Sequence, residues 1–297
     1  MAGLNETARI AKGILGEKLY QKRARAALPI LVRQATAQQK ITYGDLAEEL
    51  SIPNARNLNY VLGSVGITLL DLSRTWDEEI PAIQCLVVNS ATGLPGEGVD
   101  NFLLGGHRKE RLNRKQKEAL VNKALGNVFA YPKWHRVLNA LEIEPPKSMA
   151  QPFVEAARAG RGGGESKEHR LLKQHVARHP ASIGLPASHS VGATEFQLPS
   201  GDAVDVLFKN EVSWIAVEVK SIISSEADIA RGLFQCVKYR AVMDAWLGFR
   251  AKPIDCRAIL ALGGSFPKLL IPLRNALGIH VVENVRLVKS RQHQMRL

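Results

Sequence analysis

The stretch Gly201–Tyr239 begins with GDAVDVLFKNEVSWIAVEVK and continues, after a short gap, into a segment that contains FQCVKY. Two apolar runs of strand length flank a polar turn, so the stretch predicts a strand, a turn, a second strand and a helix. The first strand carries Asp205 and the second carries Glu218, although an unpaired carboxylate in a buried strand is costly. Because side chains alternate across a strand, Lys220 shares a face with Glu218. Two such neighbouring strands predict a metal site, and a hairpin with charged strand ends is the alternative.

The spacing of these residues resembles the motif of the PD-(D/E)xK nuclease superfamily. In that motif an Asp is followed by a hairpin and then by Asp/Glu-x-Lys, and here the matching residues are Asp205 and Glu218-Val219-Lys220. Val204 stands where the motif commonly has Pro, which is a departure from the pattern. A lone Glu-x-Lys is a weak signal, so the resemblance depends on the whole combination.

Two further features support the resemblance. Gln235 and Tyr239 lie at i and i+4 of the next predicted helix, like the Q-x-x-x-Y element of the RecB-like branch of the superfamily. Upstream, GESKEHRLLKQHVARHP reads as an amphipathic helix that could bring a third acid to the strands. Glu165 and Glu168 are the two candidates, and Glu168 is preferred because it lies one turn before the apolar contacts of the helix.

The resemblance implies a fold and a chemistry. The fold is α/β, with a restriction-endonuclease-like αβββαβ core, and the reaction is Mg²⁺-dependent hydrolysis of DNA phosphodiester bonds, with Mn²⁺ as a substitute and no nucleotide cofactor. By this resemblance Asp205, Glu218 and the backbone carbonyl of Val219 are metal ligands. Lys220 would act on the attacking water, and Gln235 would position a water, a phosphate or Lys220. A catalytically inactive nuclease fold that serves as a DNA-binding or interaction module is the alternative function.

The pattern of residues 165–297 predicts the same order of elements. Helices are expected over 165–179, 229–246 and 266–277, with a kink at Pro272, and strands over 194–198, 203–208, 214–220, 256–262 and 279–282. The predicted first helix also carries three histidines, His169, His175 and His179. No cysteine pair accompanies them, so surface histidines are expected rather than a zinc site.

The first part of the chain, residues 1–147, predicts a mainly helical, winged-helix-like domain that binds nucleic acid. Helices over 43–50 and 55–65, joined by a turn at 51–54, form a helix-turn-helix pattern, and AIQCLVVNSATGLPGEG after them predicts a strand and a glycine-rich wing. The segment resembles, weakly, the DNA-binding domain of alkylguanine-DNA alkyltransferases and alkyltransferase-like proteins. A plain helical packing domain is the alternative.

That second resemblance rests on TYGDLA, on the Ala-Arg pair that opens the second helix and on VVNSATG. It implies that Tyr43 and Arg56 help to turn a base out of the duplex. It does not carry over the nucleophile, since Gln84, not Cys85, falls at the position of the reactive cysteine. The expectation is a DNA-binding scaffold without alkyl transfer.

Charge also points to nucleic acid. The chain has 40 Lys and Arg against 28 Asp and Glu, a net charge of +12, which favours a polyanionic partner. The basic run over 107–123 is expected to hold phosphates through Arg108, Arg111, Arg114 and Lys115, unless it is only a solvated face. Double-stranded DNA is the expected partner, while RNA and a homodimer are left open.

Composition bounds the rest of the molecule. The Pro-, Ala- and Gly-rich segment 148–164 predicts a flexible linker between the first domain and a nuclease-like domain over 165–297. Three scattered cysteines indicate a reducing, cytoplasmic setting. No apolar run approaches the roughly 20 residues that cross a bilayer, so no membrane contact is expected.

Overall fold

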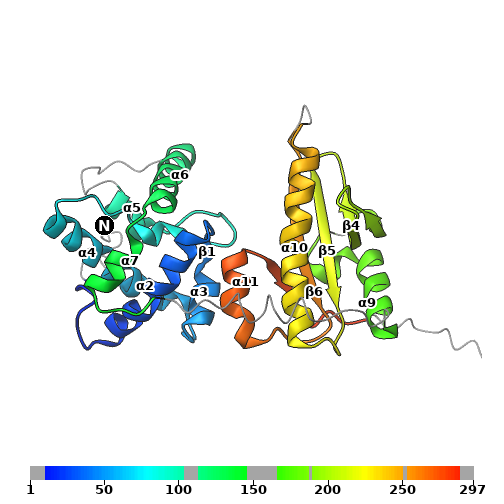
Figure 1. The fold of residues 1–297 in the computed structure, drawn as a ribbon, viewed down its shortest axis with the longest axis horizontal. Helices are drawn as coiled ribbons and strands as arrows, with labels where there is room; N and C mark the ends of the chain where they lie inside the picture. The colour runs from blue at the N-terminus through cyan, green and yellow to red at the C-terminus, as the bar shows by residue number, and fades with distance from the viewer. Residues whose placement is uncertain (1–10, 104–112, 146–165, 187–188, 250–252, 288–297) are drawn as a thin grey trace, which may run out of the picture. The chain divides into compact units, whose positions relative to one another are not determined.

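The structure is a computed structural model that describes residues 11–103, 113–145, 166–186, 189–249 and 253–287. The chain divides into two compact units, Met1–Ser148 and Met149–Leu297, and each is described by itself (Figure 1). The segment predicted as a linker, 148–164, lies outside the described residues. Within those described ranges, no helix is both long and apolar enough to cross a membrane.

The second unit is an α/β unit built on one five-stranded mixed sheet. Its strands are β3 (Ala193–Gln197), β4 (Ala203–Lys209), β5 (Ser213–Lys220), β6 (Asp255–Leu262) and β7 (His280–Val282), and its helices are α9 (Lys167–Arg178), α10 (Glu226–Leu247) and α11 (Ile271–Leu277). The strands lie in the order β3-β4-β5-β6-β7. The pairs β3–β4 and β4–β5 are antiparallel, whereas β5–β6 and β6–β7 are parallel. The long helix α10 is the crossover that the parallel pair β5–β6 requires.

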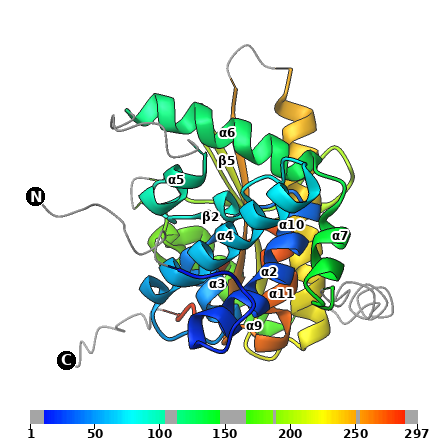
Figure 2. The ribbon, with the colours of Figure 1, turned by 90° about the vertical axis from the view of Figure 1, so that its left-hand side faces the viewer.

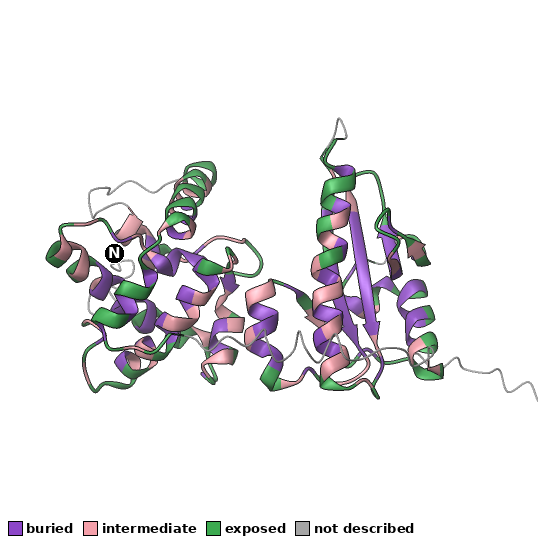
Figure 3. Cartoon of the chain, viewed as in Figure 1, coloured by how far each residue is buried: buried purple, intermediate pink, exposed green. Residues whose placement is uncertain are grey.

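Helices cover both faces of this sheet (Figure 1). Trp214 and Ala216 of β5 pack with α10 and α11 on one face, whereas Ile215, Val217 and Val219 pack with α9 on the other. The strand is therefore buried on both faces, as Figure 3 shows along β5. This burial explains why its sequence is an almost continuous apolar run rather than an alternating one.

The helix predicted over 266–277 is shorter than expected. A 3₁₀ turn, η5 (Lys268–Leu270), precedes α11, and Pro272 lies in the first turn of α11. A proline in the first turn removes an N–H that would have no partner within the helix in any case. Pro272 thus starts a helix here rather than kinking one.

The ladder between β3 and β4 is interrupted at one pair of facing residues. Thr194 pairs with Val206 and Phe196 pairs with Val204, but Glu195 and Asp205 between them are not paired. Glu195 has a φ of +53°, a left-handed conformation that costs a non-glycine residue about 1 kcal/mol or more. The interruption matters because Asp205 belongs to the candidate site.

The first unit is mainly helical (Figure 2), and its described residues share a hydrophobic core. Its helices are α2 (Leu19–Thr36), α3 (Tyr43–Glu49), α4 (Leu58–Trp76), α5 (Asp100–Leu103), α6 (Arg114–Ala130) and α7 (Trp134–Ala140). Short 3₁₀ turns, η1 (Ala55–Asn57), η2 (Ile83–Leu86) and η3 (Glu97–Val99), connect them. The helix over 43–50 is thus present as α3, and Asn54 caps η1 by accepting a hydrogen bond from the N–H of Arg56.

The helix predicted over 55–65 does not end at Gly66. It starts as η1 and continues as α4 to Trp76, ten residues beyond the glycine. Gly66 is needed for close packing instead, because a Cβ there would lie 2.5 Å from both Nε2 of Gln84 and the ring of Phe102.

The segment predicted as a strand and a glycine-rich wing has a different structure. It contains η2 and a two-residue strand, β2 (Val87–Val88), which pairs in parallel with β1 (Ile41–Thr42). A turn follows, in which the N–H of Asn89 donates to the carbonyl of Leu94 and the N–H of Gly93 donates to the carbonyl of Asn89. The described residues of this segment therefore form no antiparallel wing.

All three cysteines of the chain are free and buried. Cys85 lies in the first unit, Cys236 on α10 and Cys256 on β6. Burial raises the pKa of Cys85 to about 12 and of Cys256 to about 11, and it raises the pKa of Cys236 as well. These thiols are therefore packing groups of the two cores rather than nucleophiles.

Candidate functional site

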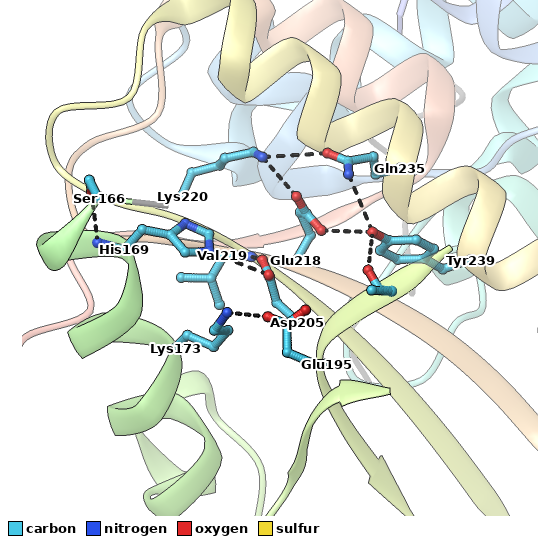
Figure 4. A network of polar contacts seen from close by, with 11 residues as sticks. Ser166, His169, Lys173, Glu195, Asp205, Glu218, Val219, Lys220, Gln235 and Tyr239 are labelled. Carbon is cyan, nitrogen blue, oxygen red and sulfur yellow. Dashed lines mark hydrogen bonds and ion pairs between the residues drawn. The ribbon is translucent and has the colours of Figure 1, made fainter. Parts of the chain in front are cut away.

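The centre of the candidate site is Glu218 on β5 (Figure 4). Its side chain is only 4% exposed. Its Oε1 accepts a hydrogen bond from Nζ of Lys220 at 2.7 Å, and its Oε2 accepts one from the hydroxyl of Tyr239 at 3.0 Å. Burial, followed by repulsion from Asp205, raises the pKa of Glu218 to about 7, although Lys220 and Tyr239 act in the opposite direction. The carboxyl group thus changes its charge near neutral pH.

Helix α10 covers Glu218 and Lys220 and holds both. Oε1 of Gln235 lies 3.4 Å from Nζ of Lys220, and Nε2 of Gln235 donates to the hydroxyl of Tyr239 at 3.3 Å. The same hydroxyl lies 3.1 Å from the carbonyl oxygen of Ala203 at the start of β4. The i, i+4 pair that resembled Q-x-x-x-Y therefore connects the helix to both strands of the hairpin.

A glycine on α10 leaves room for the lysine. A Cβ at Gly232 would lie 3.0 Å from Cε of Lys220 and 2.8 Å from Cδ1 of Leu260. The helix can approach the end of β5 closely only because this position has no side chain.

Asp205 lies on β4, where the strand ladder is interrupted. Its Oδ2 accepts the backbone N–H of Val219 at 2.8 Å, and its Oδ1 lies 3.3 Å from Nε2 of His169. The side chain of Asp205 is 14% exposed and that of His169 is 20% exposed. The backbone N–H of Val219 on β5 thus holds the carboxylate of Asp205 in place.

Among the described residues of α9, the one that contacts Asp205 is His169 rather than Glu168. Glu168 is exposed in the first turn of α9, and Glu165 lies outside the described residues. Helical spacing contained the signal for this, because His169 stands three and seven residues before Leu172 and Val176, which pack on the sheet. Glu168 stands four residues before Leu172 and fits the same spacing, so periodicity did not separate the two residues and the expectation of an acid favoured Glu168.

The expectation that the three histidines of the predicted helix 165–179 lie on the surface is wrong for His175. It is 7% exposed, its ring lies 4.6 Å from that of His179, and burial lowers its pKa.

Asp205 and Lys220 open into a cleft of about 810 Å³. Residues of α9, β3, the end of β5 and the first turns of α10 also line it, and they include the cations Arg170, Lys173 and Arg231. Lys173 is 6% exposed and pairs with Glu195, the residue with the left-handed backbone. Glu218 is not a lining residue and lies beneath Lys220.

The described residues contain no group of three or more His, Cys, Asp or Glu side chains arranged to hold a metal ion. Both oxygens of Glu218 are engaged, by Lys220 and by Tyr239. The donor types at this end of the sheet nevertheless suit a divalent cation, since Asp205 and Glu218 supply carboxylates and His169 supplies an imidazole. The repulsion between the two carboxylates is also what a bound cation would relieve.

In the first unit, Tyr43 and Gln84 line a cavity of about 250 Å³. The hydroxyl of Tyr43 accepts the N–H of Gly96 at 3.0 Å, and burial raises the pKa of Tyr43. Gln84 is 1% exposed, and neither its Nε2 nor its Oε1 has a hydrogen-bond partner within the part of the chain that the structure describes. Such an unpartnered buried amide is unusual, because buried polar groups are nearly always hydrogen-bonded.

The predicted phosphate-binding cations are placed in part. Arg56 in η1 and Lys115 in α6 are exposed, and Arg114 is exposed and paired with Glu118 at 2.8 Å. Arg108 and Arg111 lie outside the described residues.

Compared with known proteins, the chain matches no protein-family model, no curated protein sequence and no solved structure. A functional conclusion must therefore come from the chemistry of the site itself.

Proposed function

We propose that the second unit is a metal-dependent nuclease domain of the PD-(D/E)xK superfamily, which hydrolyses phosphodiester bonds of DNA in restriction, defence or repair. The observation that carries the proposal is Lys220, whose ammonium group lies 2.7 Å from the buried Glu218 and opens into the same cleft as Asp205. The element order α9-β3-β4-β5-α10-β6 supports it, because it agrees with the αβββαβ order of a restriction-endonuclease-like core.

Asp205, Glu218 and His169 would hold the metal ion. The carbonyl of Val219 remains a proposed ligand by resemblance alone. Mg²⁺ prefers carboxylate oxygens, and Mn²⁺ accepts an imidazole nitrogen as well, so Mn²⁺ is the natural substitute. When bound, the ion would supply positive charge to the phosphate oxygens and a more acidic water.

Lys220 would orient the attacking water and offset the negative charge that develops on the phosphate. Gln235 positions Lys220, and Tyr239 positions Glu218, since each contacts its partner directly. Glu218 has to lose its proton to act as a ligand, and its raised pKa of about 7 means that this form gains population as the pH rises through neutrality.

We propose that the first unit is the DNA-recognition domain, although its described residues form no antiparallel wing. The exposed Arg56, Arg114 and Lys115 are available to phosphates, and we assign the same role to Arg108 and Arg111. Tyr43 and the unpartnered amide of Gln84 in their cavity supply the means to hold a base turned out of the duplex, because an amide can donate to and accept from a base edge. Double-stranded DNA is therefore the proposed partner.

The engagement of both Glu218 oxygens favours one alternative, an inactive nuclease fold that only binds DNA. Incubation of the full chain with duplex DNA, single-stranded DNA and RNA, in Mg²⁺, Mn²⁺ or EDTA, separates the two functions. We expect metal-dependent cleavage that Lys220→Ala abolishes without loss of DNA affinity. Lys238→Ala is the matched control, because Lys238 lies on α10 but pairs with Asp202 at 2.7 Å outside the cleft. Binding without cleavage under every condition would leave the inactive fold as the function.

A further inference from the structure

The turn between β5 and α10 exposes two isoleucines next to the candidate site. The N–H of Ser224 donates to the carbonyl of Ser221 at 3.1 Å, which closes a turn with Ile222 and Ile223 at its corners. Their exposed fractions are 71% and 66%. Gly, Pro, Asn, Asp and Ser are the residues that favour turn corners, so two β-branched apolar residues gain nothing there from local structure.

The backbone of this turn is held in place. Ser221 is buried, and the N–H of Gly263 donates to the carbonyl of Lys220 at 2.9 Å. A Cβ at Gly263 would lie 3.0 Å from the amide nitrogen of Ile222, so the end of β6 packs tightly under the turn. The two isoleucines are therefore presented by fixed backbone.

The isoleucines stand at the edge of two neighbouring hollows. Ile223 lines the cleft that contains Asp205 and Lys220. Ile222 lines a second hollow of about 250 Å³ together with Gly264 and Asn284. An apolar edge thus adjoins a cleft whose walls carry charged side chains.

We propose that Ile222 and Ile223 contact the flat face of one unstacked nucleobase. Its nucleotide lies next to the scissile phosphate, which enters the cleft that contains Asp205 and Lys220. This inference rests on the proposed function. A nucleic acid strand alternates anionic phosphates with apolar base faces, which matches a charged cleft with an apolar edge. Aliphatic side chains of this size are also the ones that separate neighbouring bases in other protein–DNA complexes.

The test compares the full chain with the double variant Ile222→Ser/Ile223→Ser. Val212→Ser is the matched control, because Val212 is 66% exposed in the turn at the other end of β5, which the N–H of Asn210 closes on the carbonyl of Ser213 at 2.9 Å. Affinity is measured in EDTA, so that no cleavage occurs, for a single-stranded oligonucleotide and for a series in which one base at a time is missing.

We expect the parent and Val212→Ser to lose about tenfold in affinity when one particular base is missing, since the contact buries part of two isoleucine side chains. The double variant should bind the intact strand about tenfold more weakly and lose nothing further at that position. Contacts of the first unit cancel in this comparison, because they are the same in all arms.

The inference would be overturned if the losses in affinity from the double substitution and from the missing base were additive. It would also be overturned if the double variant bound the intact strand as tightly as the parent. A change in sedimentation coefficient on substitution would also overturn it, because the isoleucines would then pack on a second copy of the chain. Lys220-dependent cleavage is measured separately. If the chain cleaves but the losses in affinity are additive, only the base contact is refuted. If the losses are not additive but no cleavage occurs, only the hydrolytic function is refuted. Circular dichroism should be unchanged in both variants, since the substituted side chains are exposed.

Discussion

Replacement of Glu218 by Gln should stabilise the metal-free protein, and the gain should depend on pH. The pKa of Glu218 is raised to about 7 from an ordinary value of 4.5, mainly by burial. One pKa unit corresponds to about 1.4 kcal/mol, so ionising this group costs about 3 kcal/mol more in the folded protein than in the unfolded chain.

The sign follows from proton binding. Between pH 4.5 and 7 the folded protein keeps the proton of Glu218, whereas the unfolded chain has released it. The favourable contribution of the protonated group is thus complete below pH 4.5 and is lost as the pH rises through 7. The stability advantage of Glu218→Gln should therefore be smallest at low pH and grow by about 3 kcal/mol towards pH 8.

Glutamine fits the existing contacts. Its Oε1 can accept from Lys220 as the carboxylate does, and its NH₂ can donate to the hydroxyl of Tyr239. Tyr239 can then direct its own proton to the carbonyl of Ala203, 3.1 Å away. No buried polar atom of this network is left without a partner, so the variant removes a charge and little else.

The assay is urea unfolding in EDTA at matched pH values, and hydrogen exchange of peptides from β5 is used to detect the unfolding of the second unit. Fluorescence would not separate the two units, because Trp76 and Trp134 lie in the first and Trp214 and Trp246 in the second. Glu211→Gln, in the exposed turn before β5, is the control and should show no pH-dependent gain. A difference between Glu218→Gln and the parent that stays constant from pH 4.5 to 8 would refute the reasoning about burial.

Four further outcomes are expected. Mg²⁺ at about 100 times its dissociation constant should stabilise the parent by about 3 kcal/mol in thermal unfolding, and Asp205→Asn should abolish this effect. His169→Ala should raise the Mg²⁺ concentration needed for half-maximal cleavage at least about tenfold, whereas Glu168→Ala should leave that concentration unchanged. The reverse result would restore Glu168 as the metal ligand from the helix. Asp202→Asn should retain most cleavage, since its carboxylate pairs with a lysine outside the cleft, and an inactive variant would contradict this placement. Arg56→Ala should weaken duplex binding and reduce the salt dependence of the affinity by about one counterion, and unaltered salt dependence would remove Arg56 from the phosphate contacts.

The strand hairpin and its helix were predictable because their signals are local. Alternation along β5 put Glu218 and Lys220 on one face, and the i, i+4 rule put Gln235 and Tyr239 on one face of α10. In the structure these four side chains form one connected network. Membership of the nuclease superfamily is a prediction that the cleavage assay tests.

The errors arose where tertiary packing overrides a local signal. A glycine after an apolar run is a common helix end, yet Gly66 lies inside α4 because Gln84 and Phe102 pack against it. The pairing of β1 with β2 could not be predicted, since a strand of two residues has no periodicity. The interruption at Glu195 and Asp205 is likewise a property of two facing strands rather than of either sequence.

The buried thiol of Cys236 has a practical consequence. It sits on α10 beside Glu218, fully enclosed, so an alkylating reagent can reach it only when the helix lifts from the sheet. The rate at which Cys236 is alkylated, measured by mass spectrometry, would report how often α10 separates from the sheet. Cys85 is buried in the other unit, so its alkylation rate would report the opening of that unit separately. One labelling experiment on the unmodified chain, with and without DNA, could therefore tell whether DNA slows opening in one unit or in both.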